Sequence, residues 1–359
     1  MKCGMTKVVI DADIPFIKGV LEPWCKVVYK TGSEIDNQTV RESDALIIRT
    51  RTRCDKKLLN NTAVRAIFTA TIGSDHIDLD YCKSNGIEVF NAAGCNSGGV
   101  VQYVITSLFA LTDKTGQQLK DKTVGIVGAG NVGERLAQFL EKIGVAVLRC
   151  DPPKSLVNNT VKYYSLDYIL TNSDVITLHV PLDSSTYSMC SDSFLSKMKS
   201  GSILVNTARG EVVDEDAVLR FREKLGAIVT DVWAGEPLIN KDLLKVSDIA
   251  TPHIAGYSYE GKVNATVFSV INFANFFGVK DLKNFSIETK EAPLVINHRR
   301  GKRDIYSRVA EVLLERFPLY QEDEKLRTNT ANFEIIRSSY IFRREFPEDF
   351  ANYLATVLF

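Results

Sequence analysis

Thr123-Val-Gly-Ile-Val-Gly-Ala-Gly-Asn-Val-Gly133 is the stretch of this chain that decides its fold. It begins as a short apolar run, breaks at Gly128-Ala-Gly130 and continues past Gly133 with apolar residues at helical spacing. The pattern is G-x-G-x-x-G between a predicted strand and a predicted helix. Gly128 permits the tight turn, Gly130 lets the backbone approach a pyrophosphate, and Gly133 lets the helix pack closely on the strand. Because the helix start, with Asn131 and Val132, also offers free N–H groups and a positive dipole, the stretch predicts a dinucleotide site.

An acidic residue follows the next predicted strand, which covers 145–150. Asp151 stands roughly 20 residues beyond the first glycine, which is the usual spacing of a ribose-binding acid. Its carboxylate is expected to accept hydrogen bonds from the ribose hydroxyls and to repel a 2′-phosphate. The predicted cofactor is therefore NAD rather than NADP.

Composition excludes several classes of protein. The 359 residues contain 44 Lys and Arg and 44 Asp and Glu, so nothing favours a nucleic-acid or anionic-membrane partner. No apolar run approaches the roughly 20 residues that span a bilayer. The seven cysteines form no C-x-x-C pair and no zinc-type cluster with histidine, which indicates reduced thiols in the cytoplasm and no metal site.

The order of predicted elements indicates an α/β fold with two doubly wound parallel-sheet domains. Strands and helices alternate from residue 7 to 95, including a helix expected over 15–24. A long apolar helix over 96–112 leads into the glycine-rich stretch, and a second long helix over 258–279 returns to the first domain. We therefore expect a flavodoxin-like substrate domain (1–95 and 258–285), a Rossmann domain (96–257) and a small C-terminal α+β region for association (286–359). The Arg299-Arg300 and Arg343-Arg344 pairs of that last region are typical of a solvated face.

Three polar residues follow predicted strands of the second domain: Arg209, Glu236 and His253. Oxidation of a 2-hydroxy acid requires a base for the hydroxyl proton, and an imidazole can accept and return that proton near neutral pH. A carboxylate beside the imidazole fixes its tautomer, and a guanidinium can bind the substrate carboxylate through two hydrogen bonds. We interpret His253 as the general acid/base, Glu236 as its partner and Arg209 as the substrate clamp.

Around these residues the chain resembles the D-isomer-specific 2-hydroxyacid dehydrogenase family. The resemblance covers about residues 7–280 and depends on four motifs: Gly128-Ala-Gly-Asn-Val-Gly133, Asn206-Thr-Ala-Arg-Gly210, Asp231-Val-Trp-Ala-Gly-Glu-Pro237 and Thr251-Pro-His-Ile-Ala-Gly256. It implies the same catalytic trio and further cofactor contacts at Val180, Thr207, Ala208, Asp231 and Gly256.

Finer motifs are similar to a branch of that family that oxidises 4-phospho-D-erythronate with NAD in vitamin B6 biosynthesis. They include Thr69-Ala-Thr-Ile-Gly-Ser-Asp-His-Ile-Asp78, His253-Ile-Ala-Gly-Tyr-Ser258 and, more patchily, Ile341-Phe-Arg-Arg-Glu345. This resemblance implies a phosphorylated 2-hydroxy acid as substrate, a homodimer, and substrate contacts at Thr50, Thr69 and Tyr257. Among the arginines that could bind the phosphate, Arg49, Arg51 and Arg53, we favour Arg49 beside Thr50.

Two alternatives remain open at this point. One is another dehydrogenase of the family, a phosphoglycerate dehydrogenase or a hydroxypyruvate/glyoxylate reductase, although the C-terminal region lacks the pattern of a regulatory ACT domain. The other is a binding protein that senses NAD(H) on the same fold without turnover.

Overall fold

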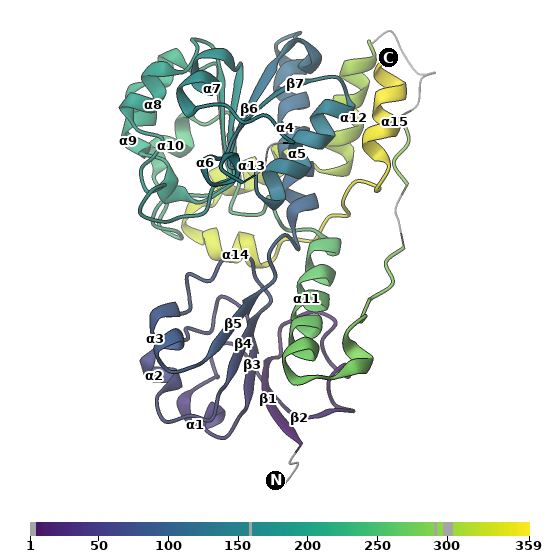
Figure 1. Cartoon of the computed structure of the whole chain (residues 1–359). Helices are drawn as coiled ribbons and strands as arrows, with labels where there is room; N and C mark the ends of the chain where they lie inside the picture. Colours follow the sequence, from purple (N-terminus) through teal and green to yellow (C-terminus); the bar gives the residue numbers. More distant parts are fainter. Residues whose placement is uncertain (1–4, 158–159, 291–292, 297–303) are drawn as a thin grey trace. The chain divides into compact units, whose positions relative to one another are not determined.

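A computed structural model describes residues 5–157, 160–290, 293–296 and 304–359. The chain divides into two compact units, each built on a parallel sheet, which confirms the predicted α/β class (Figure 1). The first unit combines Met1–Asn96 with Tyr259–Lys290, and the second combines Ser97–Ser258 with Glu291–Phe359. The C-terminal region therefore belongs to the second unit instead of standing apart.

The first unit contains a five-stranded parallel sheet with the order β2-β1-β3-β4-β5. This is the flavodoxin-like order expected of a doubly wound domain. Its strands are β1 (Thr6–Asp11), β2 (Cys25–Lys30), β3 (Ala45–Ile48), β4 (Ala66–Thr69) and β5 (Glu88–Asn91).

Both faces of this sheet are apolar because helices cover both of them (Figure 1). Residues that alternate along the strands, such as Ile10 and Phe68, pack with the long helix α11 (Tyr259–Phe277). Their neighbours, such as Val9 and Ile67, pack with short helices on the other face. Those helices are α1 (Asn37–Val40), α2 (Lys56–Leu59) and α3 (Leu79–Ser84).

The helix predicted over 15–24 is wrong. That segment folds as a series of turns, with Phe16 at φ 62° and Gly19 at φ 85°. A left-handed backbone at two positions is incompatible with a right-handed helix, and Pro23 removes a further backbone donor. The apolar residues that suggested a helix, Ile17 and Leu21, are buried in the core through these turns.

The second unit contains a six-stranded parallel sheet with the order β11-β10-β9-β8-β6-β7. Tyr163 forms an isolated parallel bridge with Arg149 of β7. With this bridge in the place of a third strand, the order matches the Rossmann order 3-2-1-4-5-6 and is extended by one strand. The strands are β6 (Thr123–Val127), β7 (Ala146–Cys150), β8 (Val175–Leu178), β9 (Ile203–Asn206), β10 (Ala227–Thr230) and β11 (Ile249–Ala250).

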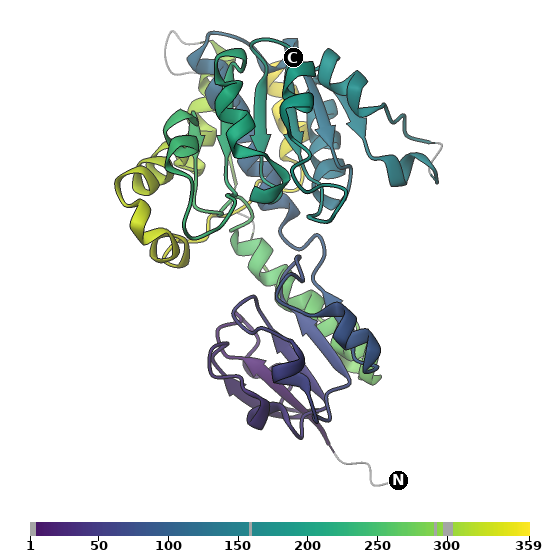
Figure 2. The same ribbon diagram turned by 90° about the vertical axis from the view of Figure 1, so that its left-hand side faces the viewer.

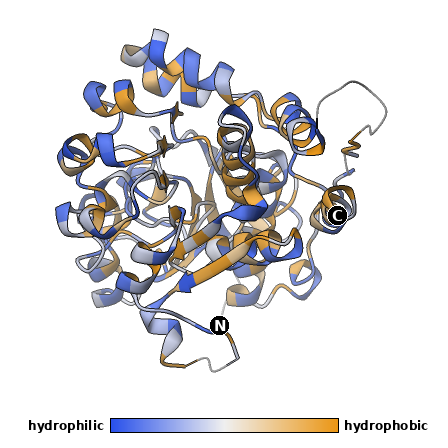
Figure 3. Ribbon diagram, turned by 90° about the horizontal axis from the view of Figure 1, so that it is seen from above, coloured by the Kyte–Doolittle hydropathy of each residue, from blue (hydrophilic) through white to orange (hydrophobic). Residues whose placement is uncertain are grey.

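Helices cover both faces of this sheet as well (Figure 2), and in Figure 3 the hydrophobic colour appears on strands and on helices alike. One face packs against α4 (Ser97–Lys114), α5 (Asn131–Lys142) and, outside them, α12 (Ile305–Arg316) and α15 (Phe350–Leu358). The other face packs against α7 (Leu166–Asn172), α8 (Asp192–Lys197), α9 (Glu215–Arg220) and α10 (Lys241–Val246). Within the described residues, no helix combines the length and the apolarity that crossing a membrane requires.

The described part of the C-terminal region consists of helices and connecting loops, whereas we expected a mixture of strands and helices. Besides α12 and α15 it contains α13 (Leu319–Thr328) and α14 (Phe333–Ser338), and no strand occurs within 304–359. Apolar residues at helical spacing explain the difference, because Val309 and Leu313 of α12 and Leu354 of α15 are fully buried against α4 and α5. The Arg299-Arg300 pair lies outside the described residues.

Candidate active site

The glycine-rich loop has the geometry that a pyrophosphate requires. Gly128 has φ 92°, and a Cβ atom at Gly133 would lie 2.0 Å from the carbonyl oxygen of Gly128. A Cβ at Gly130, in contrast, would meet no atom within 4 Å. Gly130 is also the N-cap of α5 and provides no side-chain cap for the helix, so the first N–H groups of Asn131 and Val132 remain available to an anion. The residues present therefore fit the diphosphate of NAD.

Asp151 is tied to this loop at the end of β7. Its Oδ2 accepts the N–H of Ala129 at 2.9 Å, and its Oδ1 accepts the N–H of Lys154 at 3.0 Å. The carboxylate is thus fixed beside the turn, and each oxygen keeps a lone pair that can accept from a ribose hydroxyl. This position suits the role predicted for Asp151.

The other predicted cofactor contacts follow the neighbouring strands. Val180 comes after β8, and Thr207 and Ala208 come after β9, at the same edge of the sheet as the loop after β6. The Thr207 hydroxyl lies 3.4 Å from Nδ1 of His179, and the Thr177 hydroxyl lies 2.9 Å from its Nε2. Burial lowers the pKa of His179 to about 3. His179 therefore stays neutral near neutral pH, and its ring nitrogens contact the hydroxyl groups of Thr177 and Thr207 at this edge of the sheet.

Arg209 lies on a tight turn directly after β9. Its guanidinium donates to the carbonyl of Ala208 at 2.8 Å, and the Asn206 amide donates to the carbonyl of Arg209 at 3.0 Å. A Cβ atom at Gly210 would lie 1.9 Å from the carbonyl carbon of Trp233. Only glycine allows this approach, which brings the turn of Arg209 against the loop that carries Glu236.

Glu236 and His253 form a close pair after β10 and β11. The Nδ1 atom of His253 lies 2.9 Å from Oε2 and 3.1 Å from Oε1 of Glu236. The N–H of Trp233 also donates to Oε1 at 3.0 Å. Burial raises the pKa of Glu236, but the hydrogen bond and charge of His253, the Trp233 N–H and the charge of Arg337 outweigh it and lower the pKa overall. Glu236 is therefore a carboxylate near neutral pH.

A buried aspartate shapes the loop that carries His253. Asp231 is 1% exposed, and its carboxylate accepts from the Thr251 hydroxyl at 2.6 Å and from the N–H groups of Ile254 and Ala255 at 2.8 and 2.9 Å. Burial raises its pKa. The structure thus gives the Asp231 carboxylate a structural task, while its contact with the cofactor, like that of Gly256, stays a prediction.

The C-terminal region contributes residues that sequence reasoning missed. Arg337 of α14 lies 3.4 Å from Oε2 of Glu236. We predicted a solvated face for the Arg343-Arg344 pair. Arg343 is only 7% exposed, so this prediction is wrong for Arg343. Tyr257, a predicted substrate contact, packs its ring against Tyr340 and Phe342.

Arg343 fixes the segment that follows His253. Its guanidinium donates to the carbonyl oxygens of Gly99, Ile254, Ala255 and Tyr257, and lies 4.1 Å above the centre of the Phe317 ring. The Arg-Arg run in the C-terminal motif was a signal for such a residue. No pattern in the sequence distinguished Arg337.

The remaining predicted substrate residues belong to the first unit. Arg49 donates to Asp11 at 3.1 Å and lies 3.1 Å from Asp13, so two carboxylates already neutralise its guanidinium. Thr69 is 1% exposed, and its hydroxyl lies 2.6 Å from that of Thr71 and 3.2 Å from Nε2 of His76.

Thr50 and Arg51, which follow β3, are exposed. Among the residues that the structure describes, no ion pair involves Arg51. The geometry therefore does not favour Arg49 as the phosphate ligand, because its charge is already paired.

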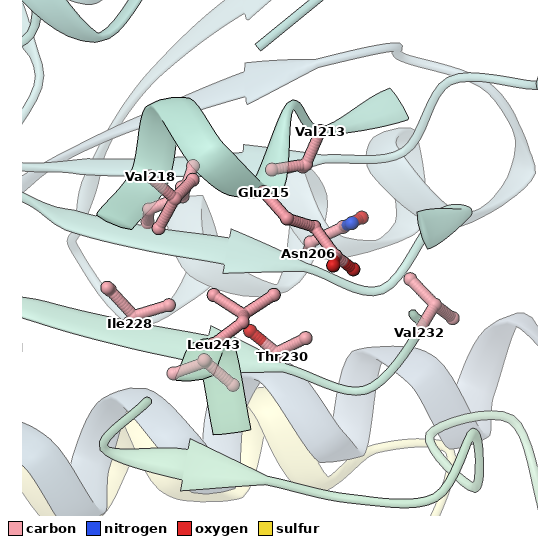
Figure 4. Close-up of a pocket in the computed structure, with 10 residues that line it drawn as sticks. Asn206, Val213, Glu215, Val218, Ile228, Thr230, Val232 and Leu243 are labelled. Carbon is pink, nitrogen blue, oxygen red and sulfur yellow. The ribbon is translucent and has the colours of Figure 1, made fainter. Parts of the chain in front are cut away.

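An internal cavity lies within the second unit (Figure 4). Its volume is about 10 Å³ for the centre of a water-sized sphere, which is room for about one water molecule. Asn206, Glu215 and Thr230 provide polar atoms among apolar neighbours, and the Glu215 carboxylate accepts the N–H of Ala234 at 2.9 Å. This cavity is too small to bind a substrate.

Comparison with known proteins agrees with this geometry. The model of the family "D-isomer specific 2-hydroxyacid dehydrogenase, NAD binding domain" matches residues 103–255. An erythronate-4-phosphate dehydrogenase of Bacteroides fragilis is 38% identical over 346 residues, which cover 94% of this chain and 97% of that protein. The corresponding protein of Porphyromonas gingivalis is 36% identical over 94% of this chain and 93% of its own length.

Solved structures show the same fold. A cofactor-bound 3-phosphoglycerate dehydrogenase of Entamoeba histolytica has a TM-score of 0.66 and 27% identity, covering 80% of this chain and 99% of that one. A D-lactate dehydrogenase of Aquifex aeolicus, in complex with NAD and lactic acid, has a TM-score of 0.64 and 26% identity, covering 77% and 97%. The identity over nearly the whole length is higher with the erythronate-4-phosphate dehydrogenases. The chain therefore belongs to the erythronate-4-phosphate dehydrogenases, within the family of D-isomer-specific 2-hydroxyacid dehydrogenases.

Proposed function

We propose that the chain oxidises 4-phospho-D-erythronate with NAD⁺ to 2-oxo-3-hydroxy-4-phosphobutanoate, NADH and a proton, as a step of pyridoxal 5′-phosphate (vitamin B6) biosynthesis. The observation that carries the proposal is the His253–Glu236 pair beside the turn of Arg209, at the edge of a sheet whose glycine loop fits NAD. The similarity to erythronate-4-phosphate dehydrogenases over nearly the whole chain favours this substrate over those of the other dehydrogenases.

The chemistry follows from the placement of these side chains. NAD⁺, when bound, accepts the hydride that leaves C2 of the substrate. His253 uses Nδ1 toward Glu236, so its Nε2 takes the proton of the C2 hydroxyl as that oxygen becomes a carbonyl. Glu236 holds the tautomer and stabilises the imidazolium that forms. Arg209 binds the substrate carboxylate and stabilises negative charge on the C2 oxygen.

Three further residues are proposed as substrate contacts. Thr50, Thr69 and Tyr257 each have a hydroxyl group for this role. For the phosphate we now favour Arg51 over Arg49, because Asp11 and Asp13 already pair with the Arg49 guanidinium. A free guanidinium binds a phosphate through two charge-assisted hydrogen bonds.

The assembly and location of the protein are also part of the proposal. We propose a cytoplasmic homodimer that associates through residues 286–359. The exposed apolar side chains of Ile335, Ile341 and Phe342 support an interface there. Within the described residues, six cysteines are free and buried, which supports a reducing compartment.

A comparison of substrates tests the proposed function. Steady-state rates with NAD⁺ are measured for 4-phospho-D-erythronate, 3-phospho-D-glycerate and D-glycerate. We expect the highest kcat/KM for 4-phospho-D-erythronate. A higher kcat/KM for either of the other two acids would refute the assignment, and binding of NADH without turnover of any of them would indicate a sensor.

A further inference from the structure

Two cations share one carboxylate at the candidate active site. Oε2 of Glu236 lies 2.9 Å from Nδ1 of His253 and 3.4 Å from a guanidinium nitrogen of Arg337. The Glu236 side chain is 17% exposed and that of Arg337 is 24% exposed, so water screens this contact only partly. The proposed chemistry uses His253 and Glu236 but gives Arg337 no task.

Arg337 is held in place from its own helix. The other terminal nitrogen of its guanidinium lies 2.9 Å from Oε1 and 3.0 Å from Oε2 of Glu334, three residues earlier in α14. The guanidinium also lies 6.0 Å from the ring centre of Phe333, a side chain that is 1% exposed in the core of the second unit. The arginine is therefore presented to Glu236 by a helix that is anchored in the same core.

The chain after α14 returns to the same loop. Arg343 binds the carbonyl oxygens of Ile254 and Tyr257, which are the two ends of the short segment that follows His253. One stretch of the C-terminal region thus contacts both halves of the catalytic pair: Arg337 contacts the carboxylate, and Arg343 contacts the loop of the imidazole.

We propose that Arg337 is a positioning residue for the oxidation: it fixes the Glu236 carboxylate toward Nδ1 of His253 and limits how strongly that carboxylate attracts the imidazolium. The proposal rests on the proposed function. A carboxylate bound by imidazole alone can rotate about its last bond, whereas a second cation on Oε2 and the Trp233 N–H on Oε1 hold it in one orientation. The same cation competes with the imidazolium for the negative charge.

The effect on pH dependence follows from the charges around the imidazole. One is Glu236, and another is Asp231 at the end of β10, whose charge interacts with that of His253. Helix α14 adds the charges of Arg337 and Glu334, and the phenol of Tyr257 lies among the same charged groups. Without Arg337 the net charge near the imidazole becomes more negative, so the protonated imidazole is favoured. Because the oxidation needs a neutral imidazole, its rate then falls at a higher pH than in the wild type.

Substitutions at position 337 test the proposal. Arg337→Gln should lower kcat about tenfold, the scale of one charge-assisted hydrogen bond, and move the acidic midpoint of kcat/KM upward. Its Kd for NADH should stay within about twofold of the wild-type value, since the glycine loop is untouched. Arg337→Lys keeps the charge and should restore most of kcat and the wild-type midpoint.

A matched control is Lys197→Gln on α8, because Lys197 pairs with the exposed Asp167 and contacts none of the candidate catalytic residues. It should behave as the wild type. A wild-type kcat and pH profile in Arg337→Gln would overturn the proposal. Equal losses in Arg337→Gln and Arg337→Lys, together with weaker NADH binding, would also overturn it, since they would indicate a purely structural role.

If Arg337→Gln does not fold, the pH profile of Arg337→Lys decides: its acidic midpoint should equal that of the wild type, and a midpoint that differs although the charge is kept would contradict the proposal. The proposed function fails differently: wild-type protein would then turn over no 4-phospho-D-erythronate.

Discussion

His253 places its Nδ1 atom 2.9 Å from Oε2 of Glu236, and it does so from a backbone with φ 57°. A left-handed conformation is strained for a residue with a Cβ atom and persists only where the surroundings enforce it. Here the carboxylate of Asp231 enforces it, by accepting the N–H groups of the next two residues. This strained backbone directs the imidazole toward Glu236, which supports the role of His253 in proton transfer.

Replacing the imidazole tests this role. His253→Ala should lower kcat by at least about 10²–10⁴, the usual contribution of a general acid/base. The Kd for NADH should remain nearly unchanged, because the residue is distant in the sheet from the glycine loop after β6. Turnover and fluorescence titration with NADH measure the two quantities. An unchanged kcat would remove His253 from the mechanism.

Asp151 should set the choice of cofactor. Asp151→Ala removes the acceptor for the ribose hydroxyls and the charge that repels a 2′-phosphate, so the ratio of kcat/KM for NAD⁺ to that for NADP⁺ should fall by about tenfold or more. Asp167→Ala, which removes an exposed carboxylate paired with Lys197, is the control. A ratio equal to that of the wild type would show that Asp151 does not contact the ribose.

His179 should make stability depend on pH. Burial lowers its pKa to about 3, whereas in the unfolded chain an imidazole titrates near 6.5. Between these values the unfolded chain binds a proton that the folded chain excludes, so the free energy of unfolding decreases as the pH falls, by about 1.4 kcal/mol per pH unit.

His179→Gln should therefore lose less stability than the wild type between pH 7.5 and 5.5, even if it is less stable at pH 7.5. Urea denaturation at the two pH values measures this difference. If the free energy of unfolding decreases equally in the two proteins between these pH values, the effect does not come from His179.

Arg343 should be essential to the stability of the second unit. Arg343→Met removes the guanidinium that donates to the carbonyl oxygens of Gly99, Ile254 and Tyr257, although the carbonyl of Ile254 keeps the N–H of Tyr257 as a donor. A hydrogen bond from a charged group contributes about 1.5–3 kcal/mol, so the free energy of unfolding should decrease by about 3 kcal/mol or more. Arg220→Met, which removes an exposed ion pair with Asp192 in the same unit, is the control and should leave it almost unchanged. Equal effects of the two substitutions would refute the role of Arg343.

The parts of the fold that sequence predicts well are those with a strong local period. The parallel strands of both sheets and the long helices α4 and α11 follow from their apolar runs, and Gly128 to Gly133 follow from the steric demands of one loop. The segment 15–24 shows the limit. Its buried Ile17 and Leu21 have a helix-like spacing, but the positive φ of Phe16 comes from tertiary contacts that no local pattern reveals.

In the candidate site, too, some residues could be predicted from the sequence and others could not. Arg209, Glu236 and His253 could be found because each follows a buried strand at the edge where ligands bind. Arg337 could not, because it lies about a hundred residues beyond Glu236 and its contact depends on how α14 packs on the second unit. The ion pairs of Arg49 were hidden for a related reason, since its partners Asp11 and Asp13 come from the neighbouring strand β1 and the turn after it.

In the proposed reaction this chain transfers the hydrogen at C2 of 4-phospho-D-erythronate to NAD⁺. The most direct measurement is mass spectrometry of the reduced cofactor after turnover of the substrate deuterated at C2. We expect NADH with one deuterium per molecule and a 2-oxo product that has lost it. Unlabelled NADH, or deuterium retained in the product, would contradict it.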